Sequence, residues 1–352
     1  MEVSNVMETI RSETPYCKCD ISKASSSEIR EENFNGKNIE RVVIYLRSSG
    51  CEWALKSGCT MCGHLKEQTQ EDISAEQYVE QFVTEYSKYD FAHYPILDLY
   101  NNGSFFNDKE LPPEARRKIF DIIAEDDDIE MIVLESRPEY ITEAKLRETK
   151  RILKDKRVEI AVGLETINDE IREQCINKGF TLKEFEVAAK LIISILNLRV
   201  YVLVKPPFIT EVEAIYDAIA SIKYCFDIGA SVVSLETVTV QDYTLTDLLY
   251  HNGLYRTTWL WSLAKIIKAT APYGKLVTGL FRFFPMPTFV PHNCERCNGL
   301  FFEALREYNR TLDPSVFNGL TCECEKEWIA DLKEVAPSIA RRVAVLDQLV
   351  PH

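Results

Sequence analysis

The sequence contains no uninterrupted apolar stretch of about 18 residues, the length that a membrane-spanning helix needs. Its first residues, Met-Glu-Val-Ser, also lack the basic and then apolar layout of a secretion signal. No internal repeat and no low-complexity tract are present. We therefore expect a cytoplasmic protein with no membrane partner.

Lysine and arginine are too few to balance the acidic side chains, and the formal net charge is -14 at pH 7. Broad binding to a phosphate backbone needs clustered cations that displace counterions. A nucleic-acid substrate would therefore require a local basic patch or a basic partner. The chain has 352 residues, of which 46% are hydrophobic and 27% charged. This composition is sufficient for one large core with an appendage, or for two domains.

Cysteine, in contrast, is abundant: the chain has 11, and most of them are closely spaced. Without an export signal they belong to a reducing compartment, where clustered cysteines more often hold a metal than form disulfides. Cys175 and Cys225 stand alone and are interpreted as small buried hydrophobic side chains. The pair Cys17 and Cys19 is weak evidence for a metal and is interpreted as two incidental thiols.

A regular alternation of strand and helix patterns begins near residue 40. Short β-branched runs predict six strands, over residues 41–46, 96–100, 129–135, 158–164, 198–205 and 231–236. Helical periodicity predicts the connecting helices, over residues 75–86, 112–123, 142–154, 182–196 and 211–226. Ser74 is the expected N-cap of the first. This α/β order predicts a parallel sheet with right-handed crossovers, either open and doubly wound or barrel-like.

The two ends of the chain differ from this central part. Residues 1–38 are polar without a sustained apolar period, and we expect an N-terminal arm that is partly flexible. The barrel is assigned to residues 39–285, including a strand-like run over residues 275–284. Prolines at 285, 287 and 291 mark a boundary. Residues 286–352 are expected to form a cysteine-rich C-terminal module with a final amphipathic helix over residues 329–346.

Ligand sites of both architectures lie at the C-terminal ends of the strands. In this sequence those ends carry polar or glycine-containing segments, at residues 51–64, 101–104, 136–139, 163–166, 205–207 and 236–237. We expect these six segments to converge on one rim.

Three cysteines, Cys51, Cys59 and Cys62, follow the first predicted strand with C-x7-C-x2-C spacing. Together with His64 they would supply four ligands of the kinds that zinc accepts. Alternatively, they could hold an iron-sulfur cube, in which three cysteines leave one iron open for a small molecule. The spacing alone leaves both alternatives open, and the position at a catalytic rim favours the cluster.

Four further cysteines, Cys294, Cys297, Cys322 and Cys324, form a C-x2-C-x24-C-x-C pattern. Two close pairs separated by a longer segment are typical of a tetrahedral structural zinc site. His292 is a spare ligand, and the close C-x-C pair leaves a second iron-sulfur cluster as the alternative. We expect zinc here, in a module held against the mouth of the barrel.

The cysteine loop also carries a family resemblance. Residues 46–51, Leu-Arg-Ser-Ser-Gly-Cys, and residues 57–63, Ser-Gly-Cys-Thr-Met-Cys-Gly, resemble the radical subunits of archaeosine synthase, a family of tRNA-modifying enzymes. More broadly, residues 40–284 resemble radical S-adenosylmethionine enzymes of the branch that includes the Elongator catalytic subunit. The C-x7-C spacing departs from the C-x3-C usual in that superfamily and fits the narrower family. The resemblance implies a partial (β/α)6 TIM-like barrel of the radical S-adenosylmethionine type.

The resemblance also implies roles at matching positions. Cys51, Cys59 and Cys62 would each bind one iron of a 4Fe-4S cluster, and S-adenosylmethionine would chelate the fourth iron. Met61 and Gly63 would place their backbone near the adenine of that cofactor.

The segment Asn102, Gly103 and Ser104 occupies the place of the family's Gly-Gly-Glu segment, whose carbonyls accept hydrogen bonds from the methionyl ammonium. The family's glutamate is absent here, so only the backbone role is carried over. Residues 136–139, Ser-Arg-Pro-Glu, resemble the Thr-Arg-Pro-Asp segment of the Elongator-like branch.

Charged strand ends complete the expected cofactor site. Glu165 matches the family's Gly-x-Glu segment, whose carboxylate contacts the cofactor. Arg137 or Lys205 can pair with the cofactor carboxylate, and Glu236 is a further candidate. Each of these residues could instead be a solvated or salt-bridged rim residue.

For this family the implied reaction is cleavage of a carbon-nitrogen bond in the lysine adduct of 7-cyano-7-deazaguanine in tRNA. It gives archaeosine through a 5'-deoxyadenosyl radical. The modified tRNA would be the substrate, and the lysine-transferring archaeosine synthase subunit would be the partner that grips the RNA. The electron donor stays open. Two alternatives also stay open: a radical enzyme acting on a peptide or small metabolite, and a zinc-stabilised binding protein without redox activity.

Overall fold

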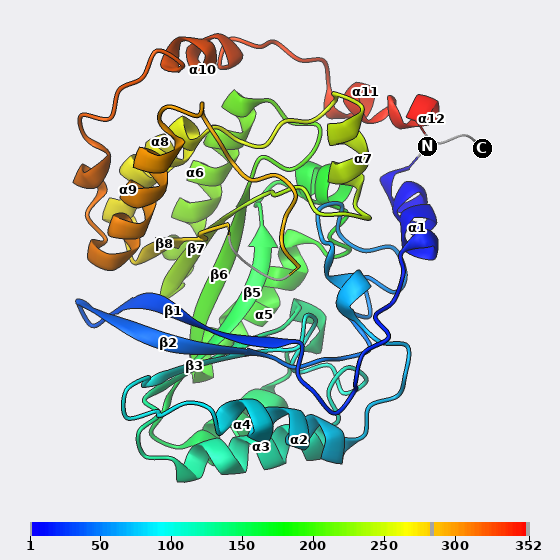
Figure 1. Cartoon of the computed structure of the whole chain (residues 1–352), viewed down its shortest axis with the longest axis vertical. Helices are drawn as coiled ribbons and strands as arrows, with labels where there is room; N and C mark the ends of the chain where they lie inside the picture. Colours follow the sequence, from blue (N-terminus) through cyan, green and yellow to red (C-terminus); the bar gives the residue numbers. More distant parts are fainter. Residues whose placement is uncertain (1, 282–284, 350–352) are drawn as a thin grey trace.

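The centre of the protein is one curved sheet of eight strands in sequence order, β1 to β8 (Figure 1). The computed structural model describes residues 2–281 and 285–349. β1 pairs antiparallel with β2, and every later neighbour pair is parallel. The strands are β1 (Ser26–Phe34), β2 (Lys37–Tyr45), β3 (Ile96–Tyr100), β4 (Met131–Glu135), β5 (Arg157–Glu165), β6 (Asn197–Val204), β7 (Val232–Thr237) and β8 (Leu276–Thr278).

Helices connect the consecutive parallel strands. They are α2 (Ala75–Tyr86), α3 (Pro113–Glu125), α4 (Glu143–Leu153), α5 (Leu182–Ile195), α6 (Glu211–Asp227), α7 (Leu245–His251) and α8 (Leu260–Thr270). The predicted N-cap Ser74 accepts a hydrogen bond from a backbone N–H three residues on, and Thr142, Thr181 and Thr210 do the same. The predicted partial barrel is confirmed, with the six predicted strands corresponding to β2 through β7.

The sheet has two different faces. The main hydrophobic core lies between the sheet and the helices and includes Ile44, Leu99 and Val200. A much smaller apolar cluster, which includes Tyr45, Tyr100 and Val133, occupies the opposite, concave face. Side chains alternate between the two faces along each strand, so the concave face is left largely to polar and aromatic residues.

The N-terminal arm, which we expected to be partly flexible and in which no helix or strand was predicted, contains two regular segments. α1 (Val3–Glu13) is a helix whose apolar side packs into the main core, and β1 covers residues 26–34. β1 pairs along its whole length with β2, so the proposed boundary at residue 38 falls inside a hairpin. Most residues of β1 are polar, so the sequence pattern did not reveal this strand.

The C-terminal part differs from its prediction in two places. Residues 329–346 do not form one helix. The structure has α10 (Glu325–Asp331), α11 (Ile339–Val343) and α12 (Leu346–Leu349), and Pro337 precedes α11 where one continuous helix would lose a backbone donor. The strand-like run over residues 275–284 is regular only in β8, and residues 282–284 of it lie outside the described residues.

The helix α9 (Asn298–Thr311) lies across the gap between the two edge strands, β1 and β8 (Figure 1). Asn309 exchanges two hydrogen bonds with the backbone of Thr278, at 2.9 and 2.7 Å. Arg310 pairs with Glu31, and its carbonyl accepts from Asn33 at 2.7 Å. The predicted C-terminal module thus covers both free edges of the sheet. The three-part division of the chain stays a prediction. No helix in the described part of the chain is long and apolar enough to cross a membrane.

Candidate cluster and cofactor site

The loop after β2 carries Cys51, Cys59 and Cys62, all half-buried. In the part of the chain that the structure describes, their sulfur atoms do not gather within 4.8 Å of one another. A single tetrahedral ion with zinc-sulfur bonds of about 2.3 Å holds its ligand sulfurs only about 3.8 Å apart. A cuboidal cluster binds each thiolate through a different iron and spreads them further. The three cysteines therefore fit the cluster better than one zinc ion.

The segment that follows β5 anchors this loop. Thr60 donates its backbone N–H to the carbonyl of Ile176 at 2.9 Å. Asn177 donates to the carbonyl of Gly58 at 2.8 Å and accepts from the indole N–H of Trp53 at 2.7 Å. Asn177 adopts a left-handed conformation with φ 56°, which asparagine tolerates well. These contacts hold the cysteine loop at the C-terminal end of β5.

Arg11, from the N-terminal helix α1, reaches into the same loop. Its guanidinium donates to the carbonyls of Cys59 at 3.0 Å and Cys62 at 2.8 Å, and also to those of Ser57 and Tyr243. The side chain is 5% exposed. The polar sequence around Arg11 gave no signal for this role, because the partners are backbone carbonyls more than 40 residues away.

The predicted segment Asn102, Gly103 and Ser104 lies against the cysteine loop. A Cβ atom on Gly103 would lie 3.2 Å from Cα of Cys51 and would collide with the carboxylate of Glu110. Glu110 accepts hydrogen bonds from the backbone N–H groups of Ser104 and Glu52. The family's glutamate is absent from this segment, but the buried carboxylate of Glu110, six residues beyond Ser104, lies against it. Its sequence position offered no clue.

Asn101, directly before this segment, is fully buried, and both polar atoms of its side chain lack a partner among the described residues. An unsatisfied buried amide costs about 1–3 kcal/mol unless a ligand completes its hydrogen bonds. Three residues of the expected cofactor site have positive φ: Asn102 (54°), Glu165 (68°) and Lys205 (57°). Asparagine tolerates this conformation, but at Glu165 and Lys205 it is strained, and such strain is concentrated at functional sites. Both observations fit a bound cofactor at this rim.

Charged groups surround the thiols. Lys178 pairs with Glu165 at 2.6 Å, and both side-chain ends pack against Gly163, where a Cβ atom would lie 2.8 Å from Nζ of Lys178. Arg137 donates to the carbonyl of Lys178 at 2.9 Å and pairs with Glu139. Burial raises the pKa of Cys59, and the positive charges of Lys178 and Arg137 oppose that effect. A metal bound here must therefore displace a proton from the thiol. Lys178 was not among the predicted residues.

The other predicted residues have identified partners. Gly63 donates its N–H to Gln241 at 2.9 Å, and Met61 packs against the main core. Lys205 forms an ion pair with the buried Glu211 at 2.7 Å, and its cofactor role stays a prediction. Glu236 lies on the concave face and accepts a hydrogen bond from a serine of its own strand.

The four C-terminal cysteines come together at a second site. Their ligand atoms all lie within 4.8 Å of one another, with sulfur-sulfur distances of 3.7 Å (Cys294–Cys297), 3.5 Å (Cys294–Cys322) and 3.6 Å (Cys297–Cys324). These values match the edge of about 3.8 Å expected for one tetrahedral ion with bonds of about 2.3 Å. They fit a single metal ion better than a second cluster. The imidazole Nδ1 of His292 faces Thr257 and Val290 instead of this site.

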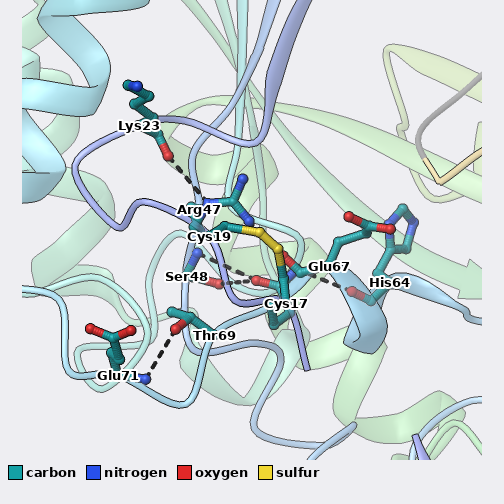
Figure 2. Close-up of a disulfide and its surroundings, with 10 residues drawn as sticks. Cys17, Cys19, Lys23, Arg47, Ser48, His64, Glu67, Thr69 and Glu71 are labelled. Atoms are coloured by element: carbon teal, nitrogen blue, oxygen red, sulfur yellow. Dashed lines mark hydrogen bonds between the residues drawn. A yellow bond between two sulfur atoms is a disulfide. The ribbon is translucent and has the colours of Figure 1, made fainter. Parts of the chain in front are cut away.

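Cys17 and Cys19 are joined as a disulfide (Figure 2). The interpretation of this pair as two incidental thiols is therefore wrong. Their Cα atoms are 5.4 Å apart, within the range that a disulfide spans. The backbone N–H of Cys17 donates to Gln68 at 2.9 Å, which fixes the arm to the segment after the cysteine loop. His64, the fourth ligand of the zinc alternative, lies among the residues around this disulfide (Figure 2).

Comparison with known proteins finds no matching family model but identifies similar whole chains. The archaeosine synthase subunit beta of Methanosarcina acetivorans is 33% identical over 296 residues, covering 84% of this chain and 85% of that protein. The archaeosine synthase subunit beta of Thermococcus kodakarensis is 31% identical over 311 residues, covering 85% and 93%. Among solved structures, methylornithine synthase matches with a TM-score of 0.51 and 16% identity, over 86% of this chain and 80% of that one. At that identity the structural likeness shows the fold alone.

Proposed function

The chain belongs to the family of archaeosine synthase beta subunits, and on that premise we propose that it is a radical S-adenosylmethionine enzyme of tRNA modification. The observation that carries the proposal is the convergence of three half-buried cysteines with strained, polar strand ends at one rim of a partial barrel. Ligand sites of such barrels lie at this rim.

Cys51, Cys59 and Cys62 would hold a 4Fe-4S cluster. Met61, Gly63, Asn102, Gly103, Ser104, Arg137, Glu165 and Lys205 remain the proposed cofactor-binding set, and Glu236, predicted with them, is assigned to the substrate below. When bound, the cluster and S-adenosylmethionine would supply a 5'-deoxyadenosyl radical. The protein's own part is to orient the cofactor and the substrate and to exclude water from the rim.

We propose further that the reaction cleaves a carbon-nitrogen bond in the lysine adduct of 7-cyano-7-deazaguanine in tRNA, giving archaeosine. The relatives are named as beta subunits, which supports a second subunit in the assembly. We propose that this partner is the lysine-transferring subunit and that it supplies most of the grip on RNA. The net charge of -14 supports this division, because an acidic chain gains little from the phosphate backbone.

The C-terminal cysteines would hold a structural zinc ion. Trp328 of α10 donates to the hydroxyl of Ser262 on α8 at 2.9 Å, and Arg342 of α11 pairs with Glu213 on α6 at 2.6 Å. The module is therefore attached to the barrel helices on both sides of the proposed zinc site. In this position a structural metal would stabilise the covered edges of the sheet.

Anaerobic reconstitution tests the proposed function. The wild-type protein should bind a 4Fe-4S cluster, cleave S-adenosylmethionine after reduction with dithionite, and convert lysine-modified tRNA when the partner is present. Cys59→Ala should abolish cluster binding, whereas the matched control Cys225→Ala removes a buried thiol in α6 and should leave it intact. If the reconstituted wild type held no cluster, the proposal would fail. If it cleaved the cofactor and acted on a peptide or small metabolite but not on the tRNA, only the substrate would be wrong.

A further inference from the structure

The part of the concave face that lies further from the C-terminal ends of the strands is filled by ion-paired side chains. Arg199 pairs with Glu159 at 2.9 Å and with Glu32 at 3.6 Å, and Arg41 pairs with Asp98 and, at 3.7 Å, with Glu32. All five side chains are nearly or completely buried. Lys275 also pairs with Glu32, so these cations and carboxylates together form the network that closes the floor of the concave face.

The layer above it, nearer the C-terminal ends of the strands, is different. Glu135 ends β4 and lies two residues after Val133 of the concave cluster, so it shares that face. Glu236 lies on β7 two residues after Ser234, which stands in register with Tyr201 of the same cluster. The two carboxylates, called the acidic pair below, are therefore on the concave face. Both are half-buried although most of their neighbours on the strands are fully buried.

No cation among the described residues forms an ion pair with the acidic pair. Arg30, whose charge opposes the rise in the pKa of both carboxyls, donates instead to Glu28 at 2.9 Å and to the hydroxyl of Tyr45 at 2.8 Å. Burial raises the pKa of Glu135 to about 7 against a hydrogen bond from Tyr201, and the charges of Asp98 and Glu236 add to the rise. Among the described residues, these two half-buried carboxylates have no ion-pair partner, and they repel each other.

Aromatic rings form the sides of this place. The rings of Tyr45 and Tyr100 lie 5.4 Å apart, and the hydroxyls of Tyr100 and Tyr201 are 3.4 Å apart. The site also adjoins the proposed cofactor rim, because Glu135 ends β4 and Glu236 lies one residue before the end of β7. An alkyl chain could lie along the tyrosine rings with its charged end at the acidic pair.

We propose that Glu135 and Glu236 bind the free ammonium group of an aminoalkyl substrate, which in the proposed reaction is the lysyl part of the modified tRNA nucleoside. Lysine has two amines, and formation of the adduct consumes one, so the other remains a cation at neutral pH. Charge-assisted hydrogen bonds to two carboxylates would hold it in place. The inference rests on the proposed function and names the residues that recognise its substrate.

The test compares two adducts of the modified nucleoside on wild-type and variant proteins. One adduct is made with lysine and the other with 6-aminohexanoate, whose single amine is consumed, so that it lacks the ammonium. The variants are Glu135→Gln and Glu236→Gln. The matched control is Glu130→Gln, which removes an exposed carboxylate just before the other end of β4. The dissociation constant of each nucleoside adduct is measured on cluster-loaded, unreduced protein, and kcat/KM is measured on tRNA carrying each adduct.

Wild type and Glu130→Gln should bind the lysine adduct about 10-fold or more tightly than the 6-aminohexanoate adduct, as expected for a charged hydrogen bond. In the two glutamine variants the preference should fall to about 2-fold or less, mainly through weaker binding of the lysine adduct. Equal binding of the two adducts by the wild type would overturn the inference, and this measurement needs no variant to fold. Retention of the preference in both glutamine variants would also overturn it. A wild type that prefers the lysine adduct but forms no product would contradict the proposed reaction and still support the ammonium site.

Discussion

Arg11 offers the sharpest test of how the fold supports the cysteine loop. Replacing it by methionine keeps much of the side chain's length but removes a guanidinium that donates to four backbone carbonyls, at distances between 2.8 and 3.3 Å. The position is buried, and a Cβ atom on Gly58 would lie only 2.8 Å from Nε of Arg11, so water has little room to replace the donors.

The cost follows from the acceptors that would be left without partners. Each unsatisfied buried carbonyl costs about 1–3 kcal/mol, and partial relaxation makes such losses less than additive. We expect Arg11→Met to lower the free energy of unfolding by about 3 kcal/mol. It should also loosen residues 57–62, so that less iron is bound after reconstitution. The positive charge of Arg11 favours the reduced form of a cluster, which is the more negative form. Removing that charge should therefore make the midpoint potential of any retained cluster more negative.

Hydrogen exchange of the amides at residues 57–62, iron content and the midpoint potential check this prediction. Lys18→Met removes an exposed cation of the same N-terminal region and serves as the control. Arg11→Lys keeps the positive charge but not the several N–H donors of the guanidinium. Its midpoint potential should therefore be close to that of the wild type, whereas the amides at residues 57–62 should stay less protected from exchange. Wild-type exchange rates and iron content in Arg11→Met would refute the reasoning.

Three further outcomes are expected. Cys297→Ser should remove the single bound zinc ion, measured by metal analysis, while leaving the iron content of the reconstituted protein unchanged. Lys205→Met should lower stability in thermal unfolding, because it leaves Glu211 buried without its cation at a cost of about 3–5 kcal/mol. Normal stability combined with weak S-adenosylmethionine binding would contradict this expectation and support the predicted cofactor role of Lys205. Burial raises the pKa of Asp217 to about 6, against the hydrogen bond from Thr166. Since the usual value is about 3.9, the wild type should lose stability as the pH rises from about 4 to 6. Asp217→Asn should remove that slope in urea titrations and be about 1–2 kcal/mol more stable at pH 7, a value reduced for partial exposure; parallel pH profiles of the two proteins would contradict it.

The regular part of the fold could be predicted because its signals are local. The six strands of residues 41 to 236 and the helices between them follow from β-branched runs, helical periodicity and N-caps such as Ser74, and their boundaries differ from the structure by a few residues. β1 could not be predicted in this way. It is polar, and its partner β2, not its own composition, makes it a strand.

The candidate site divides along the same line. The cysteines, the segment at residues 102–104, Arg137 and Glu165 were identified because they follow strands, and parallel strands bring their C-terminal ends together. Arg11, Glu110 and Lys178 were missed because they reach the site through side chains from segments that have no motif. Lys205 follows a strand in the expected way, yet its ammonium pairs with Glu211.

By itself, the sequence determined the order of strands and helices, the family, and the two groups of cysteines, since each depends on residue type and spacing along the chain. Only the tertiary structure decided which sulfur atoms gather: among the described residues those of Cys294, Cys297, Cys322 and Cys324 lie within 4.8 Å of one another, and those of Cys51, Cys59 and Cys62 do not. It also decided which charges are neutralised and which, like the acidic pair, have no ion-pair partner among the described residues. The physical reason is that ion pairing and metal geometry depend on distances between side chains far apart in the sequence, and the packed fold sets those distances.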